Sequence, residues 1–114
     1  MPVLLLVEDD PHLGEVLFSL FDGEGYTVKL ASDGIHALAE ISNRPPDVIV
    51  TDAVMPRLGG LGLITSLHSN GLRVPVILIS ANAQDPKMDG VRFISKPFEI
   101  DQLLEAVSSA LTDD

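Results

Sequence analysis

Five short apolar runs, separated by stretches with helical periodicity, constrain the fold of this chain more than any other feature. Each run is apolar almost throughout rather than at alternate positions, which indicates strands buried on both faces of a parallel sheet. The runs are Val3–Val7, Tyr26–Leu30, Asp47–Thr51, Pro75–Ser80 and Val91–Ser95. Because parallel strands are joined by right-handed crossovers, this order predicts a doubly wound α/β fold with helices on both faces of the sheet.

The stretches between the runs predict four helices. The first has Asp10 as its N-cap and Pro11 at its first position, and it should end near Gly23. The other three follow from apolar residues at 3.6-residue spacing. These residues are Ile35, Leu38 and Ile41 before Arg44-Pro45-Pro46; Leu61, Ile64 and Leu67 before Asn70-Gly71; and Ile100, Leu103, Leu104, Val107 and Leu111.

The connection between the fourth and fifth runs is too short for a full helix. About ten residues, 81–90, lie between them, and Pro86 and Asp89-Gly90 interrupt them further. We therefore predict that the helix at this crossover is shortened or missing. Apolar side chains of the last two strands should then be partly uncovered, with Met88 and Leu58 as cover, and this region should dock a partner or a second copy.

Length and charge limit the functions that the chain can have. With 114 residues, 46% of them hydrophobic and 21% charged, we expect one globular domain spanning residues 1–114. Seventeen acidic and seven basic residues give a net charge of −10, which argues against nucleic-acid and membrane partners. The absence of cysteine excludes thiolate catalysis and sulfur-ligated zinc. No apolar run approaches the roughly 18 residues of a membrane span, so we expect a cytoplasmic protein.

Polar side chains follow four of the five predicted strands, where each strand ends. They are Glu8 and Asp9, Asp52, Ser80 and Lys96. In an open α/β sheet these ends meet at one edge, which is where ligands bind. Three crowded carboxylates repel unless a cation neutralises them, and oxygen ligands favour Mg²⁺. A phosphoryl group could then contact Lys96 and Ser80, with Asp52 as the nucleophile.

Four sequence blocks resemble the signature of two-component response-regulator receiver domains. The blocks are Val7-Glu8-Asp9-Asp10, Thr51-Asp52-Ala53-Val54-Met55-Pro56, Ile79-Ser80-Ala81 and Ser95-Lys96-Pro97-Phe98. The resemblance covers nearly the whole chain and implies a flavodoxin-like sheet with strand order 2-1-3-4-5.

The resemblance also implies roles for individual residues. Asp52 would be the phosphoacceptor, Asp9 a Mg²⁺ ligand, Glu8 a supporting acid, and the main-chain carbonyl of Val54 a further metal ligand. Ser80 and Lys96 would contact the phosphoryl group. Phe93 would be the aromatic switch residue, although a simple core position explains it equally well. The bond between Lys96 and Pro97 would be a cis peptide.

The shortened fourth crossover is the largest departure from the family pattern, and the loop after the third run and Val54 depart from it as well. The loop reads Met55-Pro56-Arg57-Leu58-Gly59-Gly60 where the family often has Met-Pro-x-Met-Asp-Gly, which predicts a loop more permissive in φ. We interpret Arg57 itself as a solvated charge. Val54 replaces a polar side chain found in relatives that hydrolyse their phosphate quickly, and valine cannot orient a water. We therefore predict slow autodephosphorylation.

Three functions compete at this point. The first is a receiver that takes a phosphoryl group from a sensor histidine kinase or phosphotransfer protein and changes its contacts with an effector protein or a second copy. The second is a degenerate receiver, which acts as a constitutive interaction module. The third is a Mg²⁺-dependent phosphohydrolase, which would need a second acid at position 54 and finds valine there. We expect the first, with no enzymatic activity beyond the protein's own phosphorylation and slow dephosphorylation.

Overall fold

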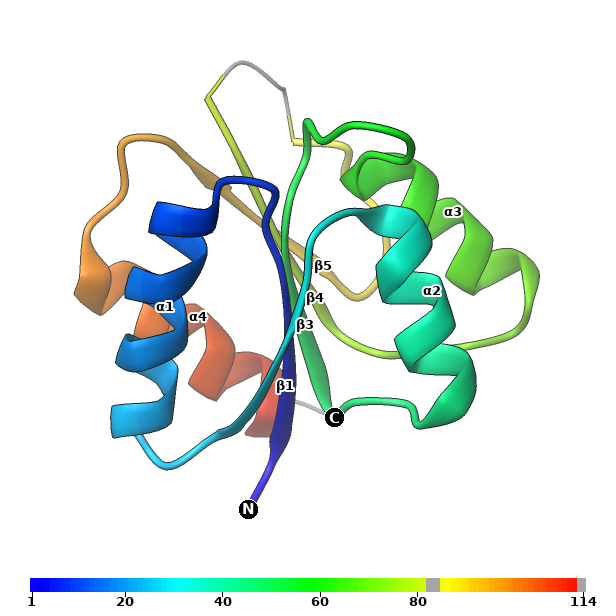
Figure 1. Ribbon diagram of the computed structural model, residues 1–114. Helices are drawn as coiled ribbons and strands as arrows, with labels where there is room; N and C mark the ends of the chain where they lie inside the picture. Colours follow the sequence, from blue (N-terminus) through cyan, green and yellow to red (C-terminus); the bar gives the residue numbers. More distant parts are fainter. Residues whose placement is uncertain (82–84, 113–114) are drawn as a thin grey trace.

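The computed structural model describes residues 1–81 and 85–112 and contains five strands and four helices there. Figure 1 shows them in chain order. They are β1 (Val3–Val7), α1 (Pro11–Gly23), β2 (Thr27–Ala31), α2 (Gly34–Asn43), β3 (Val48–Asp52), α3 (Gly60–Ser69), β4 (Val76–Ser80), β5 (Val91–Ser95) and α4 (Ile100–Thr112). Every element predicted from the sequence is present, and the strand boundaries agree to within one residue.

The strands form one parallel sheet in the order β2-β1-β3-β4-β5, which confirms the predicted flavodoxin-like topology. In the register, Val7 lies opposite Ala31 and Thr51, and Ser80 lies opposite Ser95. The carboxyl ends of the strands are therefore aligned at one edge of the sheet.

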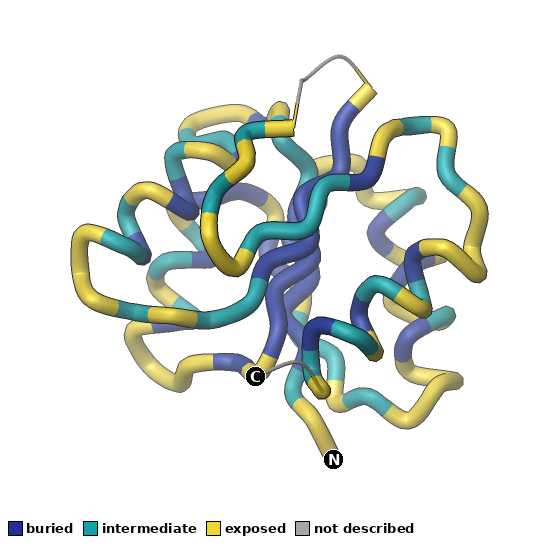
Figure 2. The backbone as a smooth tube through the Cα atoms, turned by 180° about the vertical axis from the view of Figure 1, so that it is seen from behind, coloured by how far each residue is buried: buried dark blue, intermediate teal, exposed yellow. Residues whose placement is uncertain are grey.

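Helices cover both faces of the sheet, α1 and α4 on one side and α2 and α3 on the other (Figure 1). Side chains alternate along each strand, so that Leu4 and Leu6 pack under α1 and α4 while Leu5 and Val7 pack under α2 and α3. The central strands are buried, and exposed residues lie on the outer turns and loops (Figure 2). These two apolar layers hold the strand ends in place.

Carboxylate caps mark the N-termini of α1 and α2. Asp10 accepts hydrogen bonds from the backbone N–H groups of His12 and Leu13, and Pro11 begins α1 as predicted. Asp33 caps α2 by accepting from the N–H of His36 at 2.8 Å. Each cap satisfies backbone donors that the first helical turn leaves without partners.

The connection between β4 and β5 has no helix in its described part, residues 85–90, as predicted; residues 82–84 of the predicted loop lie outside the described residues. Met88 and Leu58 pack against the core on the α2 and α3 side; their role as cover for the last two strands stays a prediction. Val91 and Phe93 of β5 are half-buried, and no large apolar side chain of β4 or β5 in the described chain is exposed. The uncovered area is thus small, and docking there stays a prediction.

Candidate functional site

The carboxyl end of the sheet brings the predicted polar residues together through backbone pairing. The N–H of Ala53 donates to the carbonyl of Ile79 at 2.8 Å, which fixes the end of β3 beside β4. The N–H of Lys96 donates to the carbonyl of Ser80 at 2.9 Å, which fixes the end of β4 beside β5. Asp52 therefore lies within reach of residues from both flanking sides of the sheet.

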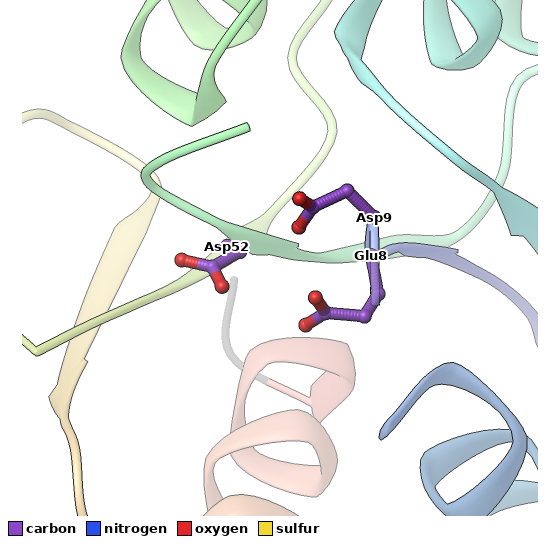
Figure 3. Close-up of side chains that lie close together, drawn as sticks. All are labelled: Glu8, Asp9 and Asp52. Atoms are coloured by element: carbon purple, nitrogen blue, oxygen red, sulfur yellow. The ribbon is translucent and has the colours of Figure 1, made fainter. Parts of the chain in front are cut away.

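Glu8, Asp9 and Asp52 form an acidic cluster. One carboxylate oxygen from each lies within 4.8 Å of the others. Figure 3 shows Glu8 and Asp9 extending from the end of β1 toward the end of β3, where Asp52 lies. The cluster offers only oxygen donors, which suit Mg²⁺. In proteins, Mg²⁺ usually binds one or two carboxylates and keeps several waters. Among the residues that the structure describes, this cluster is the group that could hold a metal.

The cluster is electrostatically strained without a cation. Burial, together with the negative charge of Asp52, raises the pKa of Glu8 to about 7 against the opposing effects of the Asp10 backbone N–H and of Lys96. Burial and the neighbouring carboxylates therefore both disfavour the charged form of Glu8.

Lys96 places a positive charge beside this cluster. Its Nζ lies 2.9 Å from Oδ2 of Asp52. Burial lowers the pKa of Lys96, but the hydrogen bond to Asp52 and the charges of Asp52, Glu8 and Asp9 outweigh it and raise the pKa above its usual value. Lys96 therefore stays charged beside the Asp52 carboxylate. The peptide bond between Lys96 and Pro97 is cis, as the resemblance predicted.

The remaining predicted site residues lie around this centre in different environments. Ser80 is buried at the end of β4. The backbone N–H of Val54 donates to Oδ1 of Asp52 at 3.3 Å, and the Val54 side chain is 73% exposed. Phe93 lies farther down β5, half-buried against the core on the α2 and α3 side. Its burial suits a core position as well as a switch.

The glycines of the loop after β3 act differently from our expectation. Among the described non-glycine residues of this loop, Arg57 is the one with a positive φ, 67°, whereas Gly59 has an ordinary φ of −80°. The two glycines instead permit close packing. A Cβ on Gly59 would lie 2.6 Å from the carbonyl oxygen of Ala53, and one on Gly60 would lie 2.6 Å from that of Asp52. The prediction of a permissive loop was therefore wrong at these positions.

The interpretation of Arg57 as a solvated charge was also wrong. Its Nε donates to Oδ2 of Asp33 at 2.8 Å, and its Nη2 contacts the same oxygen. Sequence reasoning missed Asp33 entirely. The available signal was an Asp-Gly pair directly before a helical pattern, which marks an N-cap, but nothing in the sequence pairs position 33 with position 57.

Comparison with known proteins gives one consistent result. The family model of the response regulator receiver domain matches residues 4–108. The response regulator MprA of Mycobacterium sp. (strain KMS) is 36% identical over 97% of this chain and 51% of its own length. The transcriptional regulatory protein DltR of Streptococcus agalactiae (strain NEM316) is 34% identical over 91% of this chain and 49% of its own length. The chain thus spans about half the length of these curated relatives.

Solved structures are similar across nearly the whole chain. The receiver domain of the Francisella response regulator 1452 superposes with a TM-score of 0.88 at 32% identity, covering 97% of each chain. The receiver domain of a signal transduction histidine kinase from Syntrophus aciditrophicus gives a TM-score of 0.87 at 30% identity, covering 98% of this chain and 91% of the other.

No helix in the described residues has both the length and the apolar character needed to cross a bilayer.

Proposed function

Because this chain belongs to the family of response regulator receiver domains, we propose that it takes a phosphoryl group onto Asp52 with Mg²⁺ and changes its protein contacts in response. The residues proposed for this reaction are Asp52, Lys96 and Ser80, with Glu8, Asp9, Asp52 and the carbonyl of Val54 around the metal. Residues 1–114 form one such domain in this proposal.

The observation that carries the proposal is that Asp52 lies between groups of opposite charge. On one side it shares the acidic cluster with Glu8 and Asp9, and on the other it contacts the Lys96 ammonium at 2.9 Å. A carboxylate between a metal-binding cluster and a fixed cation is suited to attack an anionic phosphoryl group, whose charge both would offset.

The transfer itself needs little from the protein beyond positioning. A carboxylate oxygen of Asp52 forms a bond to phosphorus, and the bond from phosphorus to the donor atom breaks with its electron pair leaving on the donor. Glu8, Asp9 and Asp52 would hold Mg²⁺, which would supply positive charge to offset that of the carboxylates and the phosphoryl group. Lys96 then exchanges its contact with Asp52 for one with a phosphoryl oxygen, and Phe93 reports that change.

Partners follow from the family. Receiver domains of response regulators and of histidine kinases act with kinases or phosphotransfer proteins, so the proposed donor is a sensor histidine kinase or a phosphotransfer protein. The proposed recipient of the signal is an effector protein or a second copy of the chain.

The test is an intact-mass measurement after incubation with acetyl phosphate and Mg²⁺. We expect a stable gain of one phosphoryl group that is absent from Asp52→Asn and absent when a chelator replaces Mg²⁺. An adduct that survives in Asp52→Asn would refute the assignment of the acceptor. Repeated turnover of acetyl phosphate with no adduct would indicate a phosphohydrolase instead.

One observation favours a second candidate, a degenerate receiver that binds partners constitutively. Residues 85–90, which connect to β5, contain no helix that a phosphorylation signal could move. Two-dimensional NMR of the protein with and without the phosphoryl group separates the candidates. Shifts confined to the immediate neighbours of Asp52 would favour the constitutive module, and shifts reaching Phe93 and β5 would favour the switch.

A further inference from the structure

The loop between β3 and α3, residues 53–59, is fastened to the first turn of α2. The guanidinium of Arg57 donates from Nε to Oδ2 of Asp33 at 2.8 Å and contacts the same oxygen through Nη2. The backbone N–H of Gly34 donates to the carbonyl of Leu58 at 3.0 Å. Leu58 lies so close to Gly34 that no side chain would fit between them. Two segments 24 residues apart in sequence thus meet in side-chain and backbone contacts.

The loop has an unfavourable backbone conformation where it contacts the start of α2. The N–H of Leu58 donates to the carbonyl of Pro56 at 2.8 Å, which closes a γ-turn with Arg57 at its centre and a φ of 67°. Such turns are rare for residues other than glycine, and they persist where surrounding contacts hold them. The contacts that hold this one are the ion pair with Asp33 and the hydrogen bond from Gly34.

Asp33 is anchored well enough to act as the fixed partner. Its Oδ1 caps α2 through the N–H of His36, and its Oδ2 receives Arg57. The Asp33 side chain is 6% exposed, while that of Arg57 is 63% exposed. The hydrogen bonds from His36 and from Arg57 hold the pKa of Asp33 below its usual value, so this carboxylate is charged at neutral pH.

The other end of the same loop touches the acceptor carboxylate. Val54 donates its N–H to Oδ1 of Asp52, and Gly60 donates its N–H to the carbonyl of Ala53 at 3.0 Å. Only Met55 and Pro56 lie between Val54 and Arg57, so a shift of the γ-turn should move the Val54 peptide relative to Asp52.

We propose that Asp33 and Arg57 are positioning residues for the reaction at Asp52, and that their ion pair holds the Val54 peptide in place for Mg²⁺ binding and phosphoryl acceptance. This inference rests on the proposed function. It assigns neither residue a contact with the metal or the phosphoryl group. Outer partners that orient metal ligands typically change metal affinity by about 10- to 100-fold when removed.

The test uses the variants Arg57→Gln, Asp33→Asn and their combination. Asn is as good an N-cap as Asp, so Asp33→Asn removes the ion pair and keeps the cap on α2. Arg44→Gln is the matched control, because it removes the same charge from an exposed position after α2. Mg²⁺ affinity is measured by calorimetry, and exchange of the Gly34 amide is measured by NMR on the metal-free protein.

We expect each single variant to weaken Mg²⁺ binding by about tenfold and to speed exchange of the Gly34 amide, while Arg44→Gln matches the wild type. The combined variant should be no weaker than either single one, because the two residues act as one unit. At saturating Mg²⁺, the acetyl phosphate concentration needed for half-maximal phosphorylation should change little, because neither residue contacts the phosphoryl group in this proposal.

Single variants that bind Mg²⁺ within about twofold of the wild type, or single effects that multiply in the combination, would overturn the positioning role. The failure of the proposed function looks different. In that case the wild type itself gains no phosphoryl group in the intact-mass experiment, and the positioning role falls with it.

Discussion

Substituting Gly34 with alanine sets two physical effects against each other at the first residue of α2. Helix propensity alone predicts that Gly34→Ala stabilises the protein, by up to about 1 kcal/mol. The structure predicts the opposite. A Cβ at this position would lie 2.8 Å from the Cβ of Leu58 and closer still to the Leu58 carbonyl oxygen.

The packing effect should win because the nearest obstructing atom is the backbone carbonyl oxygen of Leu58. The Leu58 carbonyl already accepts the Gly34 N–H, and Arg57 beside it is paired with Asp33, so the loop cannot move aside without losing these contacts. Forcing an extra methyl group into a packed site costs about 1–3 kcal/mol. After subtracting a propensity gain of about 1 kcal/mol, we expect the free energy of unfolding to fall by up to about 2 kcal/mol.

Urea denaturation followed by circular dichroism measures this change. Gly23→Ala is the control, because Gly23 also lies in a helix and a Cβ there would meet no described atom within 4 Å. That variant should be unchanged or stabilised by up to about 1 kcal/mol. If Gly34→Ala is as stable as Gly23→Ala, the fastening of the loop to α2 is weaker than we infer.

Three further changes test separate parts of the structure. Asp10→Ala removes the N-cap of α1 and should cost about 1 kcal/mol in urea denaturation, whereas Asp10→Asn should cost a few tenths; equal losses would contradict the capping role. Glu8 has its pKa raised to about 7 in the folded protein from 4.5, so metal-free stability should fall as pH rises from about 5 to 8, while the gain in Tm from Mg²⁺ should grow over that range. A flat profile, or one shared by Glu8→Gln, would contradict this. The exposed Val54 leaves room for a polar side chain, so Val54→Asn should shorten the half-life of the phosphorylated protein several-fold; a wild-type half-life of only seconds would refute the predicted slow hydrolysis.

The sequence by itself determined the sheet, its helices and the gathering of the site. Apolar runs without alternation marked strands buried on both faces, and parallel strands align their carboxyl ends. With the strand order that the resemblance implies, Glu8, Asp52 and Lys96 then come to the same edge of the sheet. The absence of a full helix before β5 could also be predicted from the sequence, because about ten residues that include Pro86 leave little room for one.

The tertiary structure alone decided how the loop after β3 is held and how the site is charged. The pairing of Arg57 with Asp33 depends on one positive φ and on where α2 lies, and no local pattern encodes a contact across 24 residues. Gly59 and Gly60 serve close backbone approach, which shows only when the neighbouring carbonyls are in place. The raised pKa of Glu8 likewise follows from burial, which a sequence position does not carry. The periodicity of apolar residues predicts which side chains lie at the carboxyl edge of the sheet. The packing of the folded chain decides which groups each of those side chains contacts.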